Sequence, residues 1–80
     1  MGISNLSALI IINNEVICDA SKEKSSMKWI GFIVKKSDRW EPIISTEPYY
    51  DSSEEAVKAM EGIVKEIRDH KEEIVSSLCS

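Results

Sequence analysis

A helical spacing of apolar residues is the clearest pattern in the last third of the chain. Ser52, followed three residues later by Glu55, forms a capping box, and Asp51 with Glu54 is an equally good register. Apolar residues then recur every three or four positions, as on one face of an α-helix, at 56, 57, 60, 63, 64, 67, 74, 75 and 78. This pattern predicts a helical region over about residues 52–78.

The helical region is long for a domain of this size. One continuous helix over 52–78 would measure about 40 Å, whereas a compact domain of 80 residues is roughly 30 Å across. Apolar residues are missing near His70, and Lys65 and Arg68 are typical of the last turn of a helix. The pattern therefore leaves two alternatives, one continuous helix or two helices that meet near Asp69.

Alternating positions in the middle of the chain predict β-strands. Residues 27–35 are apolar on both faces near the middle of the segment, which is typical of a central strand. Residues 40–46 form the returning strand. Because proline cannot donate a hydrogen bond to a ladder, Pro42 places this strand at an edge of the sheet or interrupts it.

The first twenty residues predict a hairpin. Residues 7–12 end in three β-branched residues, which favour a strand. Asn13 and Asn14 suit a tight turn, and residues 15–20 form the returning strand. A short helix from Ser4 to Asn13 is the alternative.

These elements together predict a single α+β domain over residues 1–80. An antiparallel β-meander of three or four strands, over about residues 7–46, packs on one long C-terminal amphipathic helix. That helix is either continuous or broken near residue 69.

Composition points to an ordinary globular domain outside the membrane. The chain is 42% apolar and 30% charged, with a formal net charge of −4. Its apolar runs are too short to span a bilayer, and no basic residue precedes Lys22, as a secretory signal would require. Two cysteines do not make a disulfide framework. We therefore expect a cytoplasmic protein.

Residues that could carry catalysis or hold a metal are sparse. The single histidine, His70, falls within the helical region, and Cys18 and Cys79 lack the short spacing of a zinc site. No glycine-rich phosphate loop and no nucleophile elbow are present. We expect no enzyme activity, no cofactor and no metal.

Two side-chain groups predict that the domain binds another protein, as a small acidic inhibitor or accessory subunit would. Aromatic residues, which are enriched in binding hot spots, gather near the expected end of the sheet, and acidic residues follow one face of the helix. The protein-binding candidates are Trp40, Tyr49, Tyr50, Glu61, Glu66 and Asp69.

A basic turn supports an alternative function. Lys35, Lys36 and Arg39 cluster beside Trp40, and basic residues next to aromatic ones can contact phosphate and stack on a base. The alternative to protein binding is therefore a nucleic-acid-binding domain, although the chain as a whole is acidic.

The end of the helical region predicts a homodimer. Ile74, Val75 and Leu78 continue the apolar stripe beyond the length that one small sheet can cover. A two-fold partner that presents the same patch would bury these side chains.

Overall fold

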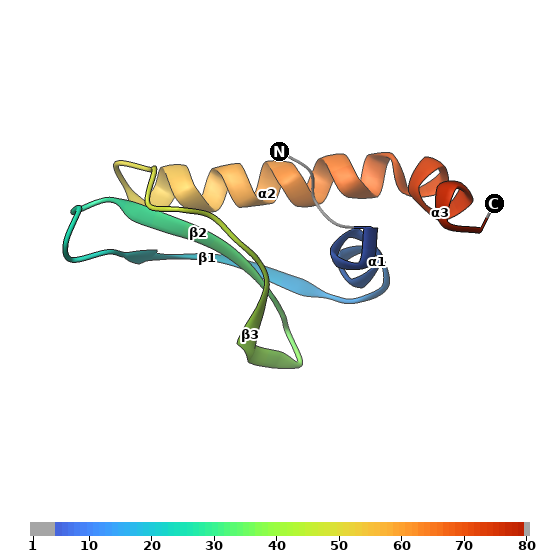
Figure 1. Ribbon diagram of the computed structural model, residues 1–80, viewed down its shortest axis with the longest axis horizontal. Helices are drawn as coiled ribbons and strands as arrows, with labels where there is room; N and C mark the ends of the chain where they lie inside the picture. The colour runs from blue at the N-terminus through green and yellow to red at the C-terminus, as the bar shows by residue number, and fades with distance from the viewer. Residues whose placement is uncertain (1–4, 80) are drawn as a thin grey trace.

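The computed structural model describes the backbone of residues 5–79 and the side chains of residues 6–77. Within this range three strands form one antiparallel sheet in the order β1-β2-β3, and helices cover one face of it (Figure 1). The elements in chain order are α1 (Asn5–Asn13), β1 (Val16–Lys22), β2 (Trp29–Lys35), β3 (Asp38–Ser45), α2 (Ser53–Asp69) and α3 (Lys71–Cys79). The predicted α+β meander is confirmed.

The hydrophobic core lies between α2 and the sheet. Cys18 of β1 pairs with Ile33 of β2, so both side chains share one face of the sheet. Met60 and Val64 of α2 are buried within the same cluster as Ile33. Gly31 leaves space for Met60, because a Cβ atom on Gly31 would lie 2.9 Å from Met60 Cγ. The missing side chain therefore lets α2 pack directly onto β2.

The strand expected at residues 7–12 is wrong, and the alternative helix is observed as α1. Strand propensity favours β-branched residues by only about 1 kcal/mol at most, whereas full burial of one isoleucine contributes about 1.5–3 kcal/mol. In a helix, positions 8, 11 and 12 share one side. Ala8 and Ile11 are accordingly buried, and Ile12 packs against the core cluster. Tertiary burial therefore outweighs local preference in this segment.

Of the two alternatives that the sequence allowed for the helical region, the structure has two helices that meet near Asp69. α2 ends at Asp69, His70 adopts φ −103° and ψ 21°, and α3 begins at Lys71. Hydrogen bonds run across the junction, because His70 N–H donates to the Glu66 carbonyl and Ile74 N–H donates to the His70 carbonyl, both at 3.1 Å.

No helix in the described range is long and apolar enough to cross a membrane.

The break changes the surroundings of the residues expected at a dimer interface. α3 packs against α1, and Ile74 is half-buried against the core cluster. Val75 is also half-buried, and the side chain of Leu78 lies outside the described residues. The chain itself therefore supplies part of the cover that a partner was expected to provide. The homodimer stays a prediction.

The edge position expected from Pro42 is confirmed. β3 is the last strand of the sheet, and Pro42 lies opposite Val34, where the register of the β2–β3 ladder shifts. Because proline lacks an N–H group, the irregular ladder at this point follows from the sequence.

The Ser52 N-cap expected at the start of α2 is confirmed, but the second bond of the predicted capping box goes to the Asp51 N–H group instead of that of Ser52. Ser52 is the N-cap, and the Glu55 N–H group donates to Ser52 Oγ at 3.2 Å. The Glu55 carboxylate in turn accepts from the Asp51 N–H group at 3.3 Å. Two backbone donors at the helix start are thus satisfied by side chains.

We expect Ser52→Ala to lower the free energy of unfolding by about 1 kcal/mol, because one backbone donor loses its acceptor. For a domain of this size that corresponds to a fall in Tm of about 4–8 °C, measured by thermal unfolding with circular dichroism. Ser53→Ala, one residue further along, is the matched control and should leave Tm nearly unchanged. Equal shifts in the two variants would contradict the assignment of the cap.

Candidate functional site

β1 presents a free edge along the outside of the sheet. The Lys36 N–H group donates to the Glu15 carbonyl at 2.9 Å, and antiparallel ladders alternate bonded and non-bonded pairs. The backbone groups of Val16, Cys18 and Ala20 therefore point away from β2. The Ala20 N–H group is already bound by the Asp19 carboxylate at 2.8 Å. The edge is thus open at Val16 and Cys18 and blocked beyond them.

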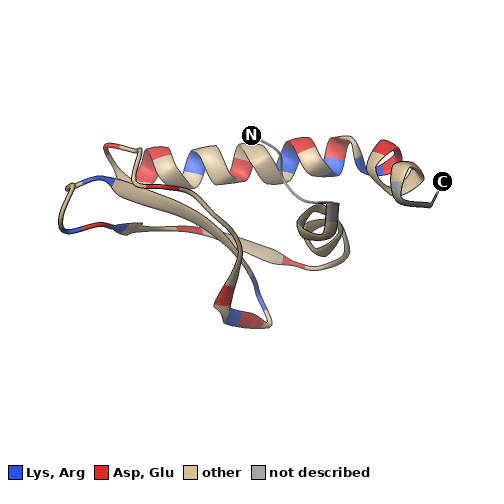
Figure 2. Ribbon diagram, in the orientation of Figure 1, with Lys and Arg blue, Asp and Glu red and all other residues tan. Residues whose placement is uncertain are grey.

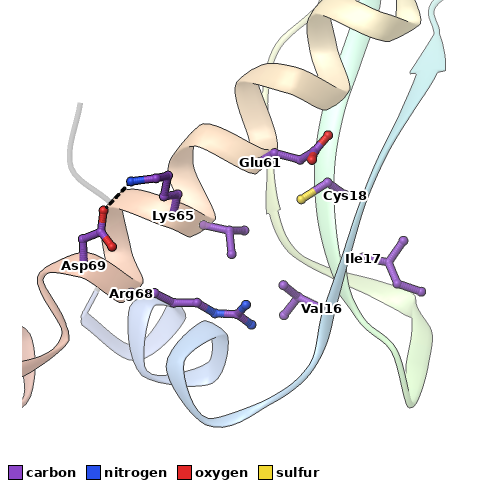
Figure 3. A pocket seen from close by; sticks show the side chains of 8 residues that line it. Val16, Ile17, Cys18, Glu61, Lys65, Arg68 and Asp69 are labelled. Carbon is purple, nitrogen blue, oxygen red and sulfur yellow. Dashed lines mark hydrogen bonds and ion pairs between the residues drawn. The ribbon is translucent and has the colours of Figure 1, made fainter.

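A groove of about 650 Å³ lies between this edge and α2 (Figure 3). Val16 and Cys18 of β1 and Val64 of α2 form its apolar floor, whereas the Ile17 side chain points away from α2. The volume falls within the range of about 300–1,000 Å³ that is usual for ligand pockets. The full lining consists of Val16, Ile17, Cys18, Glu61, Val64, Lys65, Arg68 and Asp69.

Charged side chains stand along the α2 wall of the groove. Glu61 lies beside Cys18 at one end, and Arg68 extends toward Val16 at the other (Figure 3). Lys65 and Asp69 form an exposed ion pair of 2.8 Å. The groove is therefore negative at its Cys18 end and positive at its Val16 end.

Arg68 joins the groove to the C-terminal end of α1. Its Nη2 atom donates to the Asn14 carbonyl at 3.2 Å and to the Ile11 carbonyl at 3.5 Å. A cation at this position satisfies carbonyl groups that have no partner within the helix. Figure 3 shows α1 below Arg68, near this end of the groove. Arg68 thus forms both a structural contact and part of the wall.

The thiol of Cys18 reports on the environment of the groove floor. Burial raises the pKa of Cys18, the negative charge of Glu61 raises it further, and the positive charge of Arg68 opposes both. Because a thiol reacts as the thiolate, a raised pKa makes Cys18 less reactive near neutral pH.

We expect slow alkylation of Cys18 in a Cys79→Ser variant, which leaves Cys18 as the one remaining thiol of the sequence. The rate of alkylation by iodoacetamide is measured as a function of pH. It should reach half its maximum at a pH above 9.0, the ordinary thiol pKa. The same variant unfolded in urea should reach half its maximal alkylation rate at the ordinary thiol pKa. Equal rates for the folded and the unfolded protein at pH 8 would contradict the sheltered position of the thiol.

The acidic candidates from the sequence divide between the groove and the remaining surface. Glu61 and Asp69 line the groove, whereas Glu66 is exposed outside it. The three carboxylates therefore do not form one continuous acidic face toward the groove.

The aromatic candidates are not brought together. Tyr49 and Tyr50 contact each other edge to face with ring centroids 5.2 Å apart, and Tyr50 pairs with Trp29 at the start of β2. Trp40 is 94% exposed and follows the turn at the other end of β2, about 20 Å away along the strand. These residues do not form one binding surface.

The basic turn lies among acidic residues (Figure 2). Lys36 Nζ is 3.4 Å from the Glu15 carboxylate, Lys35 is half-buried, and Arg39 is exposed directly after Asp38. We expect no binding of mixed-sequence DNA or RNA tighter than about 100 μM at physiological salt, measured by fluorescence anisotropy. Micromolar binding that weakens steeply with added salt would favour the nucleic-acid alternative instead.

The groove itself was not predicted from the sequence. The expected N-terminal hairpin would have paired residues 7–12 with β1 and covered the edge that the groove follows. Arg68 was assigned only to the end of a helix, and Cys18 only to a strand. No local signal in the sequence shows that β1 is an edge strand.

Comparison of the chain with known proteins returns no relative. No family model, no curated protein and no solved structure matches it. In the described part of the chain, no three side chains of histidine, cysteine, aspartate or glutamate lie together as metal ligands.

Proposed function

We propose that this protein is a non-enzymatic protein-binding module that captures a segment of another protein in the groove between β1 and α2. One observation supports the proposal most directly: the open backbone edge at Val16 and Cys18 borders an apolar groove floor. Backbone N–H and C=O groups at a sheet edge recognise another polypeptide backbone, and neighbouring pockets select its side chains. Such a module acts as an inhibitor or as an accessory subunit, by occupying part of its partner.

The cellular location that we propose is the cytoplasm. Cys18 carries a free thiol in a partly buried position, and free thiols persist in reducing compartments.

Peptide selection against the folded protein tests the proposed function. Two libraries of random twelve-residue peptides are displayed, one with a free C-terminus and one with the peptide followed by a linker. Selected peptides are then measured on two variants that place the same bulky side chain on α2. Glu61→Trp fills the groove from its wall, whereas Glu66→Trp lies outside it.

We expect the selected peptides to lose at least about tenfold in affinity on Glu61→Trp, because a tenfold change equals the loss of about 1.4 kcal/mol of contact. Glu66→Trp should bind as the wild type does. The peptides should also slow the alkylation of Cys18. Selection of no peptide, or equal binding to both variants, would overturn the groove as the binding surface.

A further inference from the structure

The backbone of β1 sets the form of a ligand that fits the groove. Val16 and Cys18 both direct N–H and C=O groups outward, about 6.8 Å apart along the strand, while the Asp19 carboxylate occupies the next donor at Ala20. An extended segment can therefore form two bonded pairs with β1 before it reaches the blocked position. The site fits a short strand rather than a long one.

Arg68 sets the direction of that strand. An added strand antiparallel to β1 runs from the level of Cys18 toward Val16 and points its C-terminal end at Arg68. A parallel strand would bring its N-terminal end, which carries a positive charge when free, to the same cation. Antiparallel pairing is also the slightly more stable form. Charge and pairing thus favour the antiparallel direction.

The same end of the groove indicates that the ligand chain ends there. Both hydrogen bonds of Arg68 leave from Nη2, and within the described residues no carboxylate forms an ion pair with its guanidinium group. Asp69, its neighbour in sequence, is bound to Lys65. Because β1 begins at Val16, directly after the turn that follows α1, an added strand has no β1 residue to pair with beyond Val16. A terminal carboxylate meets both conditions, because it supplies the negative charge and its chain needs no pairing beyond Val16.

We propose that the groove binds the C-terminal segment of a partner protein as a fourth strand antiparallel to β1, with the terminal carboxylate held by Arg68 and by the Val16 N–H group. This inference rests on the proposed function and names its ligand class. The last ligand residue lies opposite Val16 and places an aliphatic side chain against Val64. The third residue from the end lies opposite Cys18, where the negative charge of Glu61 favours a basic side chain.

The test uses the tightest selected peptide, synthesised as the free acid and as the C-terminal amide. We expect the acid to bind the wild-type protein at least about tenfold more tightly, as the loss of a charge-assisted hydrogen bond implies. In Arg68→Gln the ratio of the two affinities should fall toward one. Because both peptides are measured on the same variant, any loss of stability cancels from the ratio. Lys58→Gln, which removes an exposed cation of α2 outside the groove lining, is the control and should keep the wild-type ratio.

Backbone methylation of the peptide tests the strand pairing. N-methyl groups on the last and the third residue from the end should abolish binding, because their N–H groups face β1. A methyl group on the residue between them should be tolerated. Equal effects at all three positions would contradict pairing with β1.

The outcomes separate the two proposals. Equal binding of acid and amide, with the loss on Glu61→Trp retained, would overturn the C-terminal ligand and leave protein binding in the groove intact. Binding that ignores Glu61→Trp would overturn both. Sedimentation of the wild type at twice its mass of 9.0 kDa, with the Val16 and Cys18 amides protected from hydrogen exchange, would show a second copy on the edge and contradict the proposal.

Discussion

Replacing Ile11 with alanine is expected to lower the free energy of unfolding by about 2–5 kcal/mol. The Ile11 side chain is 0% exposed and belongs to the same core cluster as Met60 and Val64 of α2. Alanine removes the apolar contacts and leaves a cavity that the surrounding helices fill only partly. Since domains of this size are marginally stable, the loss amounts to a large share of the total. Urea unfolding followed by circular dichroism measures it.

Leu6→Ala in the same helix is the matched control. Leu6 is 70% exposed, and substitutions at exposed positions usually change stability by less than about 0.5 kcal/mol. The comparison also tests how α1 packs, because this helix buries Ile11 in the core and leaves Leu6 exposed. Similar losses in the two variants would contradict the packing of this helix.

Replacing Met60 with alanine is expected to cost a similar amount, about 2–5 kcal/mol. Met60 is also 0% exposed, and its side chain fills the space that Gly31 leaves open on β2. Met27→Ala is the control, because Met27 is exposed. A loss at Met27 as large as that at Met60 would show that burial under α2 is not the cause.

The contact between Met60 and Gly31 predicts strong coupling between the two positions. A Cβ atom at Gly31 would lie 2.9–3.1 Å from three atoms of the Met60 side chain, so Gly31→Ala alone should destabilise the protein. In the Met60→Ala background the same methyl group enters the vacated space. The double variant should therefore be more stable than the sum of the single losses implies, with a coupling of about 0.5–3 kcal/mol. Additive losses would contradict the close approach of α2 to β2.

Packing and function depend on the same elements in this domain. α2 buries Met60 and Val64 toward the sheet and presents Glu61, Lys65 and Arg68 to the groove. The i, i+3 and i, i+4 spacing of a helix places these two sets on adjoining sides. A variant that weakens packing therefore also changes the groove, whereas substitutions at the exposed positions Glu61 and Glu66 leave the buried contacts of α2 in place.

The sequence by itself determined the elements whose signals are local. Ser52 and Glu55 specify the start of α2 because a cap needs only residues three positions apart. The gap in the apolar stripe at His70 marked the place where α2 and α3 meet, although the stripe left a continuous helix as the other alternative. The alternation over β2 predicted a central strand. Each of these features depends on neighbours in the chain.

Only the tertiary structure decided the state of residues 5–13 and, with it, the existence of the groove. The apolar run of this segment fits a strand or a buried helix equally well by its pattern. The choice depends on whether Ile11 is buried more completely against α2 or in a ladder with β1, and these contacts join residues far apart in sequence. Because the segment forms α1 and leaves the sheet, β1 becomes an edge strand, and its outward-pointing backbone groups at Val16 and Cys18 border the open groove between β1 and α2.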